Sequence, residues 1–144
     1  MTEFDLIIDL ALTTVNDYRL QKLFSQSEDE FRTYCDGFLL SAVPLFVPKC
    51  RQSLEYDATE RTFTADLTST EQAILAKLWV IQWYARDNQT YALYRQHLQN
   101  SGSFKNHAES QNLKENSTYT DKLREEVDRQ ITAYQLEDLS TYLD

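Results

Sequence analysis

The stretch from Thr68 to Arg86 constrains the fold of this chain more than any other part of the sequence. Every residue between Ala73 and Ala85 is apolar except Lys77 and Gln82, which fall on different sides of a helix. A helix that is apolar nearly all round must be surrounded by protein, and this run is too short and too polar for a membrane span. We therefore predict a central helix, covered by several elements of this chain or by neighbouring subunits.

Two helix starts carry the same capping pattern. Thr68 and Glu71 are three residues apart, as are Ser27 and Glu30. At this spacing the hydroxyl accepts a hydrogen bond from the first turn, while the glutamate accepts one from the N–H of the cap residue. The residues that follow Ser27 predict a second buried helix, because apolar side chains recur at helical spacing. These are Phe31, Tyr34, Cys35, Phe38, Leu39, Ala42 and Val43.

The N-terminal part of the chain predicts two shorter helices. Thr2 can cap a first helix, whose apolar stripe is Phe4, Ile7, Ile8 and Ala11. Residues 13–17 resemble the end of that helix and a new cap for a helix over 18–24. Pro44 and Pro48 are expected to end the helix that starts at Ser27, because proline lacks a backbone donor.

The segment from Arg51 to Leu67 changes to a period of two. Its apolar residues alternate with polar ones on either side of residues 57–60, so a short β-hairpin is predicted between helices. The central helix follows. Residues 89–98 are expected to continue it after a break near Asp87 and Asn88, and residues 100–103 form the clearest loop in the chain.

The C-terminal part of the chain, from Phe104 to Tyr134, contains no helix breaker. A narrow apolar stripe runs along its second half, while its first half is too polar for an ordinary core. The stripe consists of Tyr119, Leu123, Val127, Ile131 and Tyr134. Residues 135–144 mix apolar and acidic residues and are predicted to be a mobile tail, with Leu136, Leu139, Tyr142 and Leu143 as partner-binding anchors.

These patterns together predict a mainly α fold, a helical bundle with a long C-terminal helix and a small β-hairpin between helices. The 144 residues contain only two glycines and two prolines, which favours long helices. We expect a single helical domain over residues 1–134, followed by the tail.

The charge and motif content narrow the possible functions. A net charge of −9 argues against a broad nucleic-acid-binding face, because binding of phosphates needs cations. Glycine-rich phosphate loops and nucleophile motifs are lacking, so we predict no enzyme, cofactor or metal. A zinc site from His97, His107, Cys35 and Cys50 is geometrically conceivable, but their spacing matches no ligand pattern. The acidic N-terminus is no signal peptide, which predicts a soluble protein made in a cytoplasm.

Three segments carry a resemblance to a known class of proteins. They are VNDYRLQKLF at 15–24, EQAILAKLWVIQWYARD at 71–87, and FKNHAESQNLKE with DKLREEVDRQITAYQ between 104 and 135. Together they resemble head–tail connector proteins of tailed bacteriophages, also called neck, adaptor or head-completion proteins. The resemblance covers most of the chain in order and spacing, and none of the segments is a catalytic signature.

This resemblance implies a structural protein of the virion neck, made in the host cytoplasm. Such adaptors are small helical domains without enzymatic activity that assemble as a ring, commonly twelvefold, below the portal. The ring extends the channel through which packaged DNA passes, and it docks the next neck or tail component. The expected partners are therefore the portal, other neck and tail proteins and further copies of the chain, with no membrane. The alternative is a soluble helical regulator or scaffold that binds one protein partner and forms no ring.

Overall fold

The computed structural model describes residues 1–15, 18–99 and 106–143, which form a mainly helical molecule with one small sheet. Within these ranges, the side chains of residues 18–19, 87–99, 106–116, 138 and 140–143 are not described. The predicted mainly α fold is confirmed. The elements are β1 (Thr2–Glu3), α1 (Phe4–Leu12), α2 (Tyr18–Gln26), α3 (Glu28–Phe46), β2 (Tyr56–Asp57), β3 (Thr62–Phe63), α4 (Ser69–Gln99) and α5 (Asn106–Leu143).

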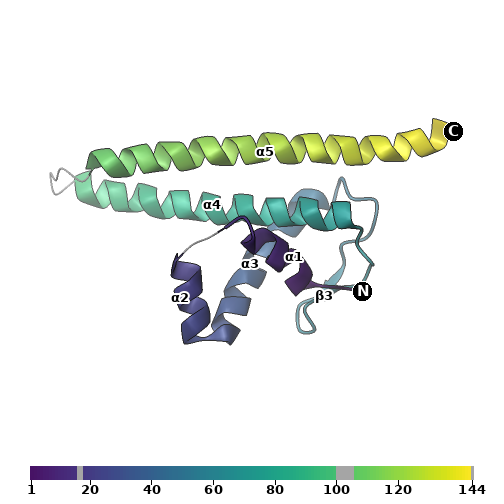
Figure 1. Cartoon of the computed structure of the whole chain (residues 1–144), viewed down its shortest axis with the longest axis horizontal. Helices are drawn as coiled ribbons and strands as arrows, with labels where there is room; N and C mark the ends of the chain where they lie inside the picture. The colour runs from purple at the N-terminus through teal and green to yellow at the C-terminus, as the bar shows by residue number, and fades with distance from the viewer. Residues whose placement is uncertain (16–17, 100–105, 144) are drawn as a thin grey trace.

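Helix α4 lies at the centre of the molecule, as its apolar sequence predicts. Helix α5 runs antiparallel along one side of it, and α1 and α3 pack against the opposite side (Figure 1). The buried residues of α4 are Glu71, Ile74, Leu75, Ala76, Leu78, Trp79, Val80, Ile81 and Trp83. The chain therefore covers this part of α4 with its own elements, and no neighbouring subunit is needed to bury it.

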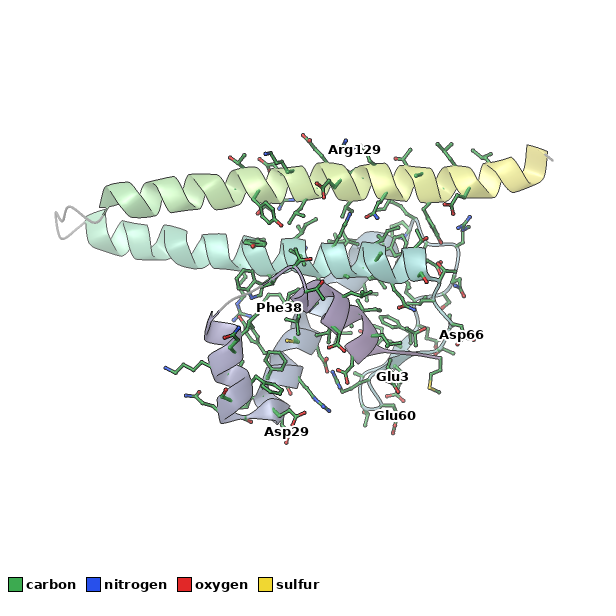
Figure 2. All side chains as sticks on the ribbon, viewed as in Figure 1. Glu3, Asp29, Phe38, Glu60, Asp66 and Arg129 are labelled. Atoms are coloured by element: carbon green, nitrogen blue, oxygen red, sulfur yellow. The ribbon has the colours of Figure 1, made fainter. Side chains whose placement is uncertain are left out.

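The α1–α3 layer meets α4 through the two apolar stripes predicted from the sequence. Phe4, Ile7, Ile8 and Ala11 of α1 are all buried. On α3 the stripe from Cys35 to Val43 is buried, while Phe31 and Tyr34 are half-buried. The indole Nε1 of Trp79 donates to the carbonyl of Cys35 at 2.9 Å, and Phe38 lies between α3 and α4 (Figure 2).

The capping pattern at Thr68 and Glu71 is confirmed in full, since each residue accepts a hydrogen bond from the backbone N–H of the other. At the start of α3 only half of it forms, because the Ser27 hydroxyl accepts from the N–H of Glu30 while the N–H of Ser27 donates to the carbonyl of Leu23. Two predicted helix boundaries are wrong. Helix α3 continues through Pro44 to Phe46. Pro44 is exposed and lies in the last turn of α3, where its missing N–H removes one helical hydrogen bond and the helix ends two residues later. Helix α4 has no break at Asp87–Asn88 and runs to Gln99, because packing along α5 overrides the weak helix propensity of these two residues.

The predicted hairpin is present and is joined by a third strand that the sequence did not indicate. The sheet order is β1-β3-β2, and both pairings are antiparallel. Thr2 belongs to this sheet and does not cap α1, whose N-cap is Glu3. The Thr2 hydroxyl instead donates to the carbonyl of Ala65 and accepts from the N–H of Leu67, each at 2.9 Å.

Arg61 joins the sheet to the two helices beside it. Its backbone has a positive φ of 58°, and its carbonyl accepts from the N–H of Phe4 at 2.9 Å. The guanidinium donates to both carboxylate oxygens of Asp36 on α3, at 2.7 and 2.8 Å, and to those of Asp5 on α1, at 2.7 and 3.2 Å. These hydrogen bonds hold the pKa of Asp5 below its usual value.

Helix α5 is longer than predicted. It starts at Asn106 and continues through the predicted tail to Leu143. In its second half Leu123, Val127, Ile131 and Tyr134 are buried, as predicted, whereas Tyr119 is exposed. The side chains of its polar first half and the predicted loop at residues 100–103 lie outside the described residues.

Candidate partner-binding surfaces

The last part of α5, residues 135–143, forms a C-terminal arm. The arm projects beyond the N-terminal end of α4, at the yellow end of α5 in Figure 1. Two of the predicted anchors, Leu136 and Leu139, are 55% and 56% exposed. Tyr142 and Leu143 lie in the last turn of α5, and their side chains are outside the described part of the chain.

The apolar side chains of the arm face a different direction from the core stripe of α5. At about 100° per residue, Leu136 lies about 180° around the helix from Val127, and Leu139 about 120°. Val127 is buried, whereas Arg129 projects from the outer side of α5 (Figure 2). The two leucines therefore do not continue the contact with α4, and they form a separate surface of the kind that another protein can cover.

The position of the arm is set by a polar cluster just before it. The Tyr134 hydroxyl donates to Oε2 of Glu71 at 2.6 Å, and it accepts from the backbone N–H of Arg51 at 2.8 Å. The Arg51 guanidinium lies 4.1 Å from the centre of the Tyr134 ring and 3.8 Å from the Glu137 carboxylate. The loop after α3, the start of α4 and the end of the α5 core stripe thus meet at one point.

Glu71 is only 1% exposed, and both of its carboxylate oxygens accept hydrogen bonds. Its Oε1 accepts from the N–H of Thr68 at 2.8 Å and from the Gln52 amide at 2.5 Å. The Cys50 thiol donates to Oε2 at 3.4 Å. Burial opposes the charge of Glu71, but the bonds from Tyr134, Thr68, Gln52 and Cys50 outweigh it and lower the pKa of Glu71. The charged Glu71 carboxylate thus holds α5 and the loop after α3 to the start of α4.

The same contacts move the pKa values of the neighbouring groups upward. Burial and the adjacent Glu71 carboxylate raise the pKa of Tyr134 to about 12, since both disfavour the phenolate. The pKa of the Cys50 thiol is raised as well, and burial is the main cause. Both groups therefore stay protonated near neutral pH, which makes Cys50 a poor nucleophile and Tyr134 a steady hydrogen-bond donor.

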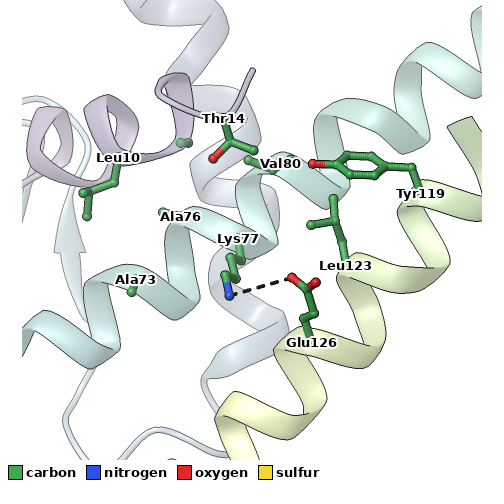
Figure 3. Close-up of a pocket in the computed structure, with 10 residues that line it drawn as sticks. Leu10, Thr14, Ala73, Ala76, Lys77, Val80, Tyr119, Leu123 and Glu126 are labelled. Carbon is green, nitrogen blue, oxygen red and sulfur yellow. Dashed lines mark ion pairs between the residues drawn. The ribbon is translucent and has the colours of Figure 1, made fainter. Parts of the chain in front are cut away.

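A groove lies between α1, α4 and α5 and has a volume of about 310 Å³ (Figure 3). Leu10 forms one rim and is 44% exposed, and the turn of Thr14 lies beside it. The remaining lining comes from Ala11, Ala73, Ala76, Lys77, Val80, Tyr119, Leu123 and Glu126. The lining is mainly apolar, so the groove fits an apolar side chain better than a polar ligand.

The charged residues of the groove are Lys77 and Glu126. The Lys77 ammonium lies 4.0 Å from the Glu126 carboxylate, across the boundary between α4 and α5. Both side chains are at least one-third exposed, so this pair contributes little to stability. Sequence reasoning missed the groove because its lining comes from three helices; the only signal was that Lys77 interrupts an apolar run.

Two kinds of feature were sought among the described residues, a cluster of metal ligands and a helix that could cross a bilayer. Among them, no group of three or more histidine, cysteine, aspartate or glutamate side chains is placed to hold a metal. None of the described helices is both long enough and apolar enough to cross a bilayer. Cys35 lies in the core, as predicted, and burial raises the pKa of its thiol to about 12.

No family model, curated protein or solved structure matches this chain.

Proposed function

We propose that this chain is a head–tail connector protein of a tailed bacteriophage, a structural component of the virion neck without enzymatic activity. Its copies form a ring below the portal, twelvefold in the class that the sequence resembles. The ring extends the channel for packaged DNA and offers a docking surface to the next neck or tail component.

The observation that carries this proposal is the arm. A helix of 38 residues packs on the body through one stripe and then presents Leu136 and Leu139 on another side, beyond the start of α4. An exposed apolar pair on one side of a helix is suited to bind a protein partner through a helix-in-groove contact.

The charge of the chain also supports the proposal. A subunit with 23 acidic and 14 basic residues has a net charge of −9, so a ring of copies is strongly negative and suits a negative channel wall. Such a wall repels the phosphates of DNA, so the DNA passes without binding to it. Packaged DNA is then cargo and not a ligand.

Electron microscopy of the purified chain, alone and mixed with the portal protein of the same virus, tests this function. We expect rings that stack coaxially on the portal, and we expect virions lacking the chain to have filled heads without tails. Binding of a single protein partner without any ring would favour the alternative, a helical regulator or scaffold. Catalytic turnover or tight, salt-dependent DNA binding would contradict both.

A further inference from the structure

We propose that the groove between α1, α4 and α5 receives the C-terminal arm of a second copy of this chain, with Leu136 and Leu139 as the inserted side chains. This inference rests on the proposed function, because it identifies the contact between neighbouring subunits of the ring. It also states which surface of each subunit takes part.

The groove has the size and chemistry to accept these side chains. Three alanines, Ala11, Ala73 and Ala76, leave a space of about 310 Å³ in a part of the molecule where three helices meet. This volume is at the lower end of the range for pockets that enclose a ligand, and it is more suited to one or two side chains than to a large cofactor. Leu10 at the rim adds exposed apolar surface that an incoming helix would cover.

The arm of the same chain cannot fill this groove. Leu136 lies ten residues beyond Glu126, so a continuous helix places it about 15 Å farther along the axis than the groove. The bonds of Tyr134 to Glu71 and Arg51 hold the helix in this register. The two leucines also face away from the side of α5 that packs on α4. An arm that enters this groove must therefore belong to another copy of the chain.

A second copy fits the charges of both surfaces. Residues 135–144 contain Glu137, Asp138 and Asp144 and no basic residue, whereas the groove contains the Lys77 ammonium. The two ion pairs that involve these regions, Lys77 with Glu126 at 4.0 Å and Arg51 with Glu137 at 3.8 Å, are long and solvent-exposed. Breaking the pair of Lys77 with Glu126 therefore costs little free energy, and Lys77 can pair instead with an acidic residue of the other copy's arm.

The contact joins two different surfaces and is therefore heterologous. Each copy supplies one arm and one groove, so every arm in a closed ring finds a groove and none is left over. An isologous dimer would use the same surface twice and would end after two copies. The arm-in-groove contact thus agrees with a ring and gives its subunits a common direction.

Disulfide trapping between two differently tagged copies tests the contact. One copy carries Leu139→Cys and the other Leu10→Cys; both positions are exposed, so folding is expected to be normal. Under mild oxidation we expect several times more mixed disulfide from this pair than from Leu139→Cys with Leu45→Cys, an exposed leucine of α3 that does not line the groove. Leu136→Cys with Thr14→Cys provides a second pair.

Mixed disulfide at the level of the Leu45 control for both pairs would overturn the inference. The double variant Leu136→Asp/Leu139→Asp is expected to abolish self-association in sedimentation, while Leu45→Asp/Val47→Asp, also at exposed positions, is expected to leave it unchanged. Rings that persist in the arm variant contradict the arm-in-groove contact and leave the proposed function standing. Trapped pairs without rings or portal binding contradict the proposed function and leave the contact standing.

Discussion

The hydroxyl of Tyr134 donates a 2.6 Å hydrogen bond to Glu71, which is 63 positions earlier in the chain. Glu71 completes the cap of α4 through Thr68, so one carboxylate both starts the central helix and fixes the register of α5 on it. Because the arm begins directly after Tyr134, this bond also determines where the arm leaves the body.

Tyr134→Phe should lower the free energy of unfolding by about 1.5–3 kcal/mol, since it removes a bond to a buried charged group. Tyr56→Phe is the matched control, because the Tyr56 ring is exposed and we expect a change within about 0.5 kcal/mol. Chemical denaturation of both variants measures the difference. Equal stability of the two variants would mean that the Glu71 cluster does not hold α5.

The stability of the protein should depend on pH through the same pair. The pKa of Tyr134 rises from 10.0 to about 12 on folding, so its contribution is complete below pH 10 and is lost between pH 10 and 12. The pKa of Glu71 is lowered from 4.5, so its contribution is complete above about pH 4.5 and is lost as the pH falls through the folded value. Unfolding curves across pH should show a smaller alkaline loss in Tyr134→Phe than in the wild type, because in the variant only the raised pKa values of Cys35 and Cys50 contribute to it.

The side chain of Arg61 stabilises the fold, whereas its positive φ destabilises it, and two substitutions separate these effects. Arg61→Ala leaves Asp5 and Asp36 without their shared guanidinium and should destabilise by about 1–3 kcal/mol, allowing for partial exposure of Asp5. Arg61→Gly loses the same bonds but relieves the positive φ, so it should be more stable than the alanine variant by about 1 kcal/mol. An alanine variant at least as stable as the glycine variant would contradict this assignment.

Leu78→Ala tests the central position of α4. Leu78 is buried between the layers, and its truncation should destabilise by about 2–5 kcal/mol. Leu45→Ala, at an exposed position on α3, should cost less than about 0.5 kcal/mol. A loss below about 1 kcal/mol for Leu78→Ala would place α4 at the periphery and would contradict the architecture.

Truncation after Glu137 separates the arm from the body. It keeps the Tyr134 bonds and the Arg51–Glu137 pair, so the melting temperature should hardly change. Assembly with the portal should fail, because Leu139 and the end of α5 are missing. Unfolding of the truncated chain would show that the arm belongs to the core, and tailed infectious particles would show that it is not the docking element.

The sequence predicted those features of the fold that depend on short-range pattern. The cap formed by Thr68 and Glu71, the buried stripe of α1 and the apolar surroundings of α4 all follow from spacing within one helix. The predicted burial of Leu123, Val127 and Ile131 holds for the same reason. Each of these features is local, so it needs no knowledge of which segments meet.

The remaining features depend on contacts between distant segments. The Tyr134–Glu71 bond, the double carboxylate pairing of Arg61 and the third strand at Thr2 join residues far apart in the chain. No periodicity marks such partners. The predicted anchors Leu136 and Leu139 are exposed, but their direction relative to the core stripe required knowing that α5 continues unbroken to Leu143.

Helix α5 continues without a break across Tyr134, so the direction in which Leu136 and Leu139 point is fixed relative to the core stripe of the same helix. One residue inserted directly after Tyr134 would leave every core contact in place and turn the two leucines by about 100° around the axis. Insertion of a whole heptad would nearly restore their direction and move them about 10 Å outward. Insertions or deletions directly after Tyr134 therefore change the direction and the reach of the two leucines, and with them the partner that can bind, while the core of the protein stays the same.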